Sequence, residues 1–148
     1  MVTPLQLANV YTIIGRYGLS KPLSIIKTHK KTNEVQVFSK SLVKIVLKML
    51  ESVTKPGGVG IKAAIRGYKV AAKTGTSKKV NINGKYVNRY ISYTVGVAPI
   101  SHPKFSLIVM INDPKAGKYY GGTISAPVFS SIMNFALRII NIKPDDIY

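Results

Sequence analysis

The densest group of chemically active side chains in this sequence is Lys73-Thr74-Gly75-Thr76, followed directly by the hydroxyl of Ser77. A short apolar stretch with the character of a strand leads into it. Because side chains alternate between the two faces of a strand, Thr74 and Thr76 are expected to point one way and Lys73 and Gly75 the other. Two hydroxyls beside a lysine can hold a carboxylate, and a glycine lets a ligand or another backbone come close. The pattern predicts a ligand-holding strand that needs further groups from elsewhere.

Two Ser-x-x-Lys spacings, Ser24 with Lys27 and Ser41 with Lys44, raise the alternative of a serine nucleophile activated by a lysine. Residues three apart are neighbours on a helix, where the lysine could deprotonate the serine. The first pair lies in residues 23–27, which are expected to form a minor strand. The second pair lies on an ordinary amphipathic helix, where surface serine and lysine are common. We therefore interpret both pairs as structural.

Carboxylates and thiols are scarce in this chain. It has five Asp and Glu residues in total and no cysteine, which excludes disulfides, thiolate metal sites and a cysteine nucleophile. Five acids leave too few carboxylates for a paired acid–base site or a hard-cation site. Asp145 and Asp146 are expected to be solvated in a frayed tail. The sequence therefore predicts no metal site and no cofactor.

The formal net charge of +17 points toward nucleic acid or an anionic membrane as a partner. However, 18 of the 22 basic residues are lysine, spread from Lys21 to Lys143 with no more than two in succession. Arginine, which reads bases better, is scarce. We expect weak, non-specific binding at most, and a small basic nucleic-acid-binding protein remains an alternative from a different class. No apolar run approaches the roughly 20 residues of a membrane span, and we identify no targeting signal.

Helix signals organise the amino-terminal half. Thr3 and Gln6 form a capping box that predicts a helix ending at Gly15 or Gly18. A second helix is predicted to begin near Ser39, with an apolar stripe facing the core. The members of this stripe are Leu42, Ile45, Val46, Met49, Leu50 and Val53.

The carboxy-terminal half alternates strand signals with turns. The predicted elements are strands at residues 68–77, 90–98 and 105–112 and a last helix at residues 125–141. Asn83-Gly84 predicts a hairpin turn, and the apolar run at 105–112 is typical of a central strand covered on both faces. The packing face of the last helix is predicted to contain Phe129, Ile132, Met133, Ala136, Ile139 and Ile140. Three neighbouring strands followed by a helix indicate an α+β fold, an antiparallel sheet flanked by helices.

With these elements placed, the motifs resemble those of a known family. The chain resembles the carboxy-terminal part of a penicillin-binding protein transpeptidase domain, and in particular the division-specific class B enzymes, the FtsI-type peptidoglycan D,D-transpeptidases. The matching passages follow the family's order over nearly the whole chain, at residues 2–8, 49–53, 56–58, 73–76, 96–99, 111–114, 116–122 and 125–129. The implied fold is part of the penicillin-binding transpeptidase, or serine β-lactamase-like, fold.

The resemblance implies roles for the residues of the opening motif. Lys73 would support catalysis by hydrogen-bonding toward a serine of the family's Ser-x-Asn motif and by favouring an anionic substrate. Thr74 and Thr76, separated by Gly75, would hold the terminal carboxylate of a D-Ala-D-Ala stem peptide or of a β-lactam. The backbone N–H of Thr76 would supply one donor of an oxyanion hole.

The resemblance also implies an aromatic wall and a set of partners. Tyr119 and Tyr120 would rim the cleft, with Tyr90 as a further contributor; the alternative for these tyrosines is packing at the sheet edge. By family, the partners would be peptidoglycan stem peptides, β-lactams and proteins of the division machinery. The location would be the periplasmic face of the bacterial inner membrane.

The chain departs from the family pattern at the nucleophile. In the family, the nucleophilic serine with its lysine and the Ser-x-Asn motif precede the helix that begins here after Thr3, and no Ser-x-Asn occurs in this sequence. We therefore expect residues 1–148 to form the carboxy-terminal portion of one transpeptidase domain. The nucleophile-bearing half, the membrane anchor and the non-catalytic domain would be absent, leaving about three strands of a five-stranded sheet.

Two expectations follow from that missing half. The chain alone should be inactive, and it should be unstable because the strand at 105–112 would keep an unpaired edge. A remnant of a split or truncated gene, without function, remains the alternative.

Overall fold

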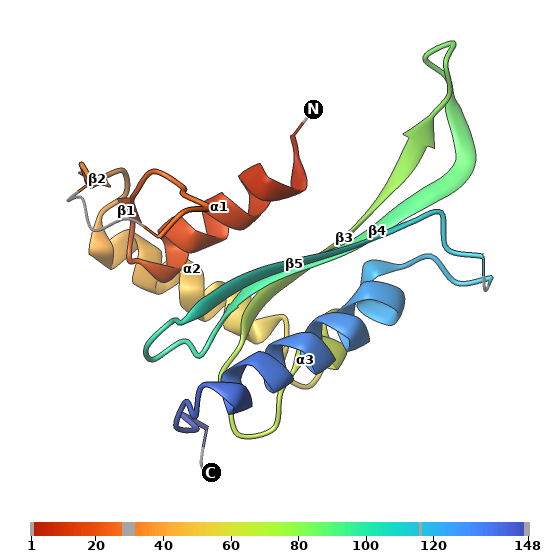
Figure 1. Cartoon of the computed structure of the whole chain (residues 1–148). Coiled ribbons are helices and arrows are strands. Elements are labelled where there is room, and N and C mark those ends of the chain that lie inside the picture. The colour runs from red at the N-terminus through yellow and green to blue at the C-terminus, as the bar shows by residue number, and fades with distance from the viewer. Residues whose placement is uncertain (1, 28–31, 116, 147–148) are drawn as a thin grey trace.

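The computed structural model describes residues 2–27, 32–115 and 117–146. Its elements are α1 (Pro4–Gly15), β1 (Leu19–Ser20), β2 (Val35–Gln36), α2 (Lys40–Ser52), the 3-10 helix η1 (Ile61–Ala63), β3 (Ala71–Val80), β4 (Tyr86–Ala98), β5 (Phe105–Asn112) and α3 (Gly121–Ile139). Strands β3, β4 and β5 form an antiparallel sheet in that order, and β1 pairs with β2 in a small ribbon. Helices α1 and α2 lie on one face of the sheet and α3 crosses the other (Figure 1). The predicted α+β fold is confirmed.

Elements with strong local signals form as predicted. The capping box of α1 is complete: Thr3 Oγ1 accepts from the Gln6 N–H at 3.2 Å, and Gln6 Oε1 accepts from the Thr3 N–H at 2.8 Å. The side chain of Ser39 caps α2. The hairpin between β3 and β4 closes with the Gly84 N–H donating to the Asn81 carbonyl at 3.0 Å. In each case the interacting groups lie within four residues of one another.

The sheet separates two hydrophobic clusters. Because β3 alternates, Ala71 packs on the α1–α2 side and Ala72 on the α3 side. The α1–α2 cluster includes Tyr11, whose pKa is raised to about 12 by burial and, secondly, by the neighbouring phenol of Tyr93. The α3 cluster is built around Phe129 and its neighbours one and two turns further along the helix. Both faces of β3 and β4 are therefore covered along the first half of β3.

The predicted packing stripe of α2 is partly wrong. Val43 and Leu47 are buried, whereas Leu42, Ile45 and Met49 are exposed. The helix carries apolar residues on more than one side, so periodicity alone does not select the side that meets the sheet. The structure places the buried stripe about one residue further along.

The last helix and the minor strand also differ from prediction. Helix α3 begins at Gly121, four residues before the predicted start, and its buried face includes Leu137 in place of Ile132, Ile139 and Ile140. Residues 23–27 form no strand, and the side chain of Ile25 is fully exposed. β-branched residues form a strand only where a partner strand lies beside them. Here the two-stranded ribbon is formed by β1 and β2, and residues 23–27 have no place in it.

The apolar strand β5 has its predicted bounds, but within the described residues it is bonded to β4 alone. It is therefore an outer strand here and not a central one. Most of its side chains are half-buried, and Met110 is exposed. The unpaired edge that the family resemblance implies is present in this part of the chain.

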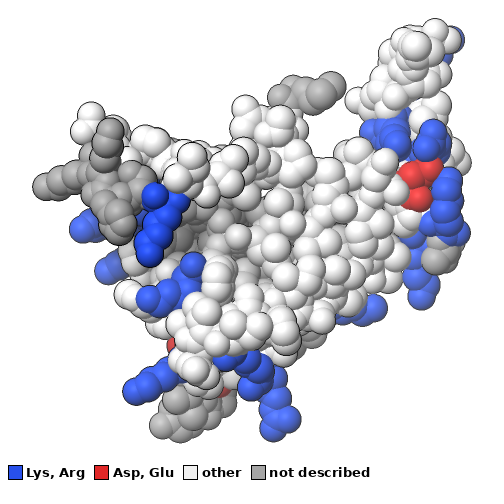
Figure 2. All heavy atoms as spheres, viewed as in Figure 1, with Lys and Arg blue, Asp and Glu red and all other residues white. Residues whose placement is uncertain are grey.

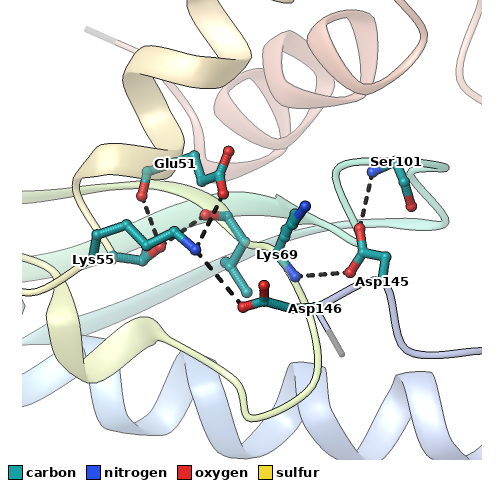
Figure 3. A network of polar contacts seen from close by, with 8 residues as sticks. Glu51, Lys55, Lys69, Ser101, Asp145 and Asp146 are labelled. Atoms are coloured by element: carbon teal, nitrogen blue, oxygen red, sulfur yellow. Dashed lines mark hydrogen bonds and ion pairs between the residues drawn. The ribbon is translucent and has the colours of Figure 1, made fainter. Parts of the chain in front are cut away.

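The carboxy-terminal segment holds the loop that leads into β3 (Figure 3). The Asp145 carboxylate accepts from the Lys69 N–H at 2.8 Å and from the Ser101 N–H at 3.1 Å. Asp146 lies 3.7 Å from the Lys55 ammonium, which also pairs with α2. The prediction of a frayed tail is therefore wrong for both acids. They lie three and four residues after Ile142, which packs against the α3 cluster, and they bind backbone N–H groups and a lysine of neighbouring loops.

Candidate functional site

The opening motif lies on an outer strand of the sheet. On β3, Lys73 is opposite Val95 of β4 and Thr76 is opposite Ser92, and among the described residues no strand pairs with the other edge. The Lys73 side chain is exposed, and its ammonium donates to the Thr74 carbonyl at 2.8 Å. The motif is thus open along one edge, where an extended ligand could lie beside β3.

The residues of the motif alternate between faces as the sequence predicts. Thr76 faces α3, whereas a Cβ at Gly75 would collide with the ring of Tyr93 on the opposite face. The expectation that Gly75 leaves space for a ligand or a backbone is therefore corrected. The space is occupied by an aromatic side chain of the neighbouring strand, so glycine is needed here for packing within the sheet.

The hydroxyl of Thr76 is held by the first residue of α3. The Gly121 N–H donates to Thr76 Oγ1 at 2.9 Å. A Cβ at Gly121 would lie 2.5 Å from the Gly75 carbonyl oxygen and 2.7 Å from that of Tyr93, so only glycine can approach the sheet this closely. Since the oxygen of Thr76 already accepts a hydrogen bond, its O–H remains available to donate. An ionised carboxylate only accepts hydrogen bonds, so it requires such a donor.

A cavity of about 440 Å³ opens on the α3 side of the motif. Its polar lining consists of the side chains of Thr74, Thr76 and Thr123 and the cation Lys62. The rest comes mainly from the turn before η1, from the glycines that begin α3 and from Tyr120. The two threonines of the motif therefore line a common hollow together with Lys62.

The three tyrosines singled out by the family resemblance come together. The rings of Tyr90 and Tyr119 stack with centroids 4.0 Å apart and planes 8° apart, and Tyr120 tilts against Tyr119 at 4.6 Å. The contact between the two hydroxyls raises the pKa of Tyr120 above its ordinary value. Tyr90 lies opposite Lys78, two residues beyond Thr76. The cluster therefore borders the motif, with Tyr120 exposed and facing the cavity.

Sequence reasoning missed three buried hydroxyls beside the motif. On β4, Ser92 donates to the Tyr119 carbonyl, and Thr94 Oγ1 lies 2.8 Å from Ser125 Oγ of α3. Ser125 in turn donates to the Gly121 carbonyl at 3.0 Å. The available signal was the spacing of Ser92 and Thr94, since residues two apart on a strand lie on the same face.

An ion-pair cluster lies beside the tyrosine cluster, where the Asp113 N–H donates to the Tyr90 carbonyl at 2.8 Å. Asp113, just after β5, accepts from Arg89 Nε at 2.8 Å and lies 2.7 Å from the Lys115 ammonium. The Arg89 bond first and the Lys115 bond second lower the pKa of Asp113 to about 2. This ion pair joins the first residues of β4 to the end of β5 and has no bond to the Lys73–Thr76 motif among the described residues.

The two Ser-x-x-Lys pairs form no catalytic arrangement in the described part of the chain. The Ser24 hydroxyl donates to the Ile26 carbonyl at 2.6 Å, in a bend and not in a strand. The Ser41 hydroxyl is 3.2 Å from that of Ser39, exposed at the start of α2. Over residues 2–27, 32–115 and 117–146, no three His, Cys, Asp or Glu side chains are grouped so that they could hold a metal ion.

Lys and Arg side chains do not form a continuous basic stripe on the face drawn in Figure 2. They gather toward the two ends of the molecule and leave its middle largely uncharged. Nucleic-acid binders concentrate their cations on one face or along one element. The face drawn therefore gives no support to the nucleic-acid alternative.

Comparison with known proteins agrees with this geometry. The sequence profile of the family described as "Penicillin binding protein transpeptidase domain" matches residues 1–134. The chain is 61% identical to a peptidoglycan D,D-transpeptidase FtsI of Buchnera aphidicola subsp. Baizongia pistaciae, over 98% of this chain and 26% of that protein. It is 59% identical to the FtsI of Escherichia coli K12, over 98% of this chain and 25% of that protein. The chain thus spans about a quarter of the length of these relatives.

A solved structure gives the same result for the fold. The transpeptidase domain of Burkholderia pseudomallei penicillin-binding protein 3, in its apo form, superposes with a TM-score of 0.88 at 37% identity, over 97% of this chain and 44% of that one. The profile covers most of the chain, and the elements that carry the Lys73 motif lie within the part that superposes. This chain belongs to the penicillin-binding protein transpeptidase family.

Proposed function

We propose that this chain supplies the substrate-docking wall of a peptidoglycan D,D-transpeptidase that crosslinks stem peptides of the septal wall and binds penicillin. Thr74 and Thr76, with the charge of Lys73 beside them, would hold the terminal carboxylate of D-Ala-D-Ala or of a β-lactam. The observation that carries the proposal is the Gly121 N–H bonded to Thr76 Oγ1, which leaves the Thr76 hydroxyl as a hydrogen-bond donor in a hollow that Lys62 also lines. Among the described residues, the strand that carries Thr76 has one open edge.

The chemistry would be acyl transfer through a serine outside these 148 residues. That serine would attack the carbonyl of the penultimate D-Ala, the terminal D-Ala would leave, and an amine of a second stem peptide would take the acyl group. Holding the carboxylate fixes the scissile carbonyl relative to β3. The Thr76 N–H would then stabilise the developing oxyanion. Tyr90, Tyr119 and Tyr120 would shield one side of the cleft.

Partners and location are proposed on the same basis. The relatives named peptidoglycan D,D-transpeptidase FtsI support peptidoglycan as the substrate. On the family resemblance, the partners would include proteins of the division machinery, and the location would be the periplasmic face of the inner membrane. In the part of the chain that the structure describes, no helix has the length and apolar character to cross a membrane.

The test is a chimera in which this chain replaces the matching segment of Escherichia coli FtsI. We expect the chimera to be labelled covalently by a fluorescent penicillin, with the label mapping outside residues 1–148, and the chain alone to remain unlabelled. A folded chimera that takes no label would contradict the proposal. So would a label that survives denaturation and maps to this chain, where Ser24 and Ser41 would be examined first.

A second arm separates a working half from a remnant. The 148-residue chain and the complementary amino-terminal part of the same FtsI would be expressed together and captured through a tag on either one. Association that restores labelling supports a functional half. Separate, unlabelled pieces support a remnant without function.

A further inference from the structure

We propose that Thr94 and Ser125 are positioning residues for the carboxylate-binding hydroxyl of Thr76. They seat the first turn of α3 against the sheet, so that the Gly121 N–H meets Thr76 Oγ1 and leaves the Thr76 O–H free to donate. This inference rests on the proposed function, because it assumes that Thr76 binds a carboxylate. Neither Thr94 nor Ser125 touches the ligand in this account.

The hydrogen bonds can be assigned by counting protons. Each hydroxyl has one proton to donate. Ser125 donates to the Gly121 carbonyl at 3.0 Å, so the proton in the 2.8 Å contact with Thr94 comes from Thr94. Thr94 therefore donates to Ser125, and Ser125 donates to the residue whose N–H holds Thr76. These hydrogen bonds connect Thr94 of the sheet to Ser125 and Gly121 of α3, and Gly121 in turn to Thr76 of the sheet.

Burial lets the hydrogen bonds of Thr94 and Ser125 hold the first turn of α3 in place. The side chains of Thr94 and Ser125 are completely inaccessible to solvent. Water cannot replace a partner that is removed, so the remaining hydroxyl keeps its desolvation cost. Ser125 lies one helical turn after Gly121 on the same side of α3, and a displacement at Ser125 is therefore transmitted to Gly121.

The register of the sheet places the support directly behind the motif. Thr94 is paired with Thr74 across β3 and β4, and the next residue on that face of β4, Ser92, is paired with Thr76. Gly121 fits against the backbone of Gly75 with no space for a Cβ. A small retreat of α3 would therefore lengthen the 2.9 Å bond to Thr76 before it disturbed the hydrophobic cluster under the helix.

The chain offers a matched control on the opposite face. Thr12 of α1 lies 2.7 Å from Ser106 of β5 and donates to the Ala8 carbonyl, four residues back, at 3.0 Å. This contact has the same chemistry as the Ser125–Thr94 pair. It has no bond to the motif.

The experiment measures carboxylate discrimination in the chimera with Escherichia coli FtsI. The quantity is the acylation rate constant for a penicillin with a free carboxylate divided by that for its methyl ester. We expect Thr94→Val and Ser125→Ala each to lower this ratio about three- to tenfold, the size of one weakened hydrogen bond to a charge. Thr94→Ser, which keeps the hydroxyl, should restore the ratio, and Thr12→Val should leave it unchanged.

The outcomes separate the inference from the function on which it rests. If Thr76→Val leaves the ratio unchanged, the proposed carboxylate role of Thr76 is wrong. If Thr76→Val lowers the ratio and Thr94→Val behaves like Thr12→Val, the positioning role is wrong. Should Thr94→Val fail to fold, Ser125→Ala with Thr94→Ser decides the question, since an unchanged ratio in Ser125→Ala would by itself overturn the inference.

Discussion

Two contacts between a helix and the sheet use the same chemistry on opposite faces. On one face the hydroxyl of Thr12 reaches Ser106, and on the other the hydroxyl of Ser125 reaches Thr94. In both, the helix hydroxyl also donates to the carbonyl four residues earlier. The first pair is only partly buried, whereas the second is completely buried. Ser125 of the second pair donates to the carbonyl of Gly121, the residue whose N–H holds Thr76. We therefore expect removal of a hydroxyl to have a larger effect in the buried pair, because water cannot replace the lost partner there.

The largest effect is expected from adding a methyl group where each helix meets the sheet. At Gly121 a Cβ would lie 2.5 Å from a backbone oxygen, whereas at Gly15 of α1 the nearest atoms are side-chain carbons at 3.2 and 3.3 Å. We expect Gly121→Ala to destabilise the fold by about 3 kcal/mol or more, because backbone cannot move aside. Gly15→Ala should cost less than about 1 kcal/mol. Urea unfolding of the chimera carrying each variant measures both.

A similar loss for the two glycine variants would contradict this comparison. It would mean that the start of α3 is free to shift away from the sheet. In that case Gly121 could not fix the hydroxyl of Thr76.

A smaller difference is expected when one hydroxyl is removed from each pair. Thr94→Val leaves Ser125 buried without its donor, and we expect a loss of about 1–3 kcal/mol in unfolding free energy. Thr12→Val leaves Ser106 half-exposed and able to bind water, so the expected loss is about 0.5–1 kcal/mol. Equal losses would indicate that the two faces are equally hydrated, against the burial observed.

The smallest effect concerns an ion pair whose basic side chains are exposed to solvent, in contrast to the two hydroxyl pairs. Arg89 and Lys115 depress the pKa of Asp113 to about 2, so their stabilising effect is complete above the ordinary value of 3.8 and is lost as the pH falls toward 2. Replacing Arg89 with Met should raise the pKa of Asp113 toward its ordinary value. It should also lower the unfolding free energy at neutral pH and leave it unchanged below about pH 2. The loss should be small, because the Arg89 side chain is more than half exposed and its pair with Asp113 is screened by solvent. Carboxyl-carbon NMR of Asp113 between pH 2 and 5 measures the change, and an unchanged pKa would show that Arg89 is not the main partner.

Features with short-range causes could be predicted from the sequence. The capping box at Thr3, the turn at Gly84, the bounds of β5 and the strand carrying Lys73 and Thr76 all depend on neighbouring residues. The family resemblance added the tyrosine cluster, which the structure brings together.

What the sequence could not show depends on contacts between distant segments. Gly121 lies 45 positions after Thr76, and Asp145 binds the backbone of Lys69 from 76 positions away. Contacts with distant segments also decide which side of α2 meets the sheet, because that helix has apolar residues on several sides. These features follow from packing, which no local pattern in a single sequence reports.

The account depends most on the claim that the Thr76 hydroxyl donates to a carboxylate. The direct measurement is penicillin acylation of the chimera with Escherichia coli FtsI, comparing the free acid with its methyl ester in Thr76→Val and Thr76→Ser. The account predicts that Thr76→Val slows acylation by the acid about tenfold or more with little change for the ester, and that Thr76→Ser retains the original ratio. Equal slowing of both compounds would contradict it, because Thr76 would then act on the fold or the reaction and not on the carboxylate.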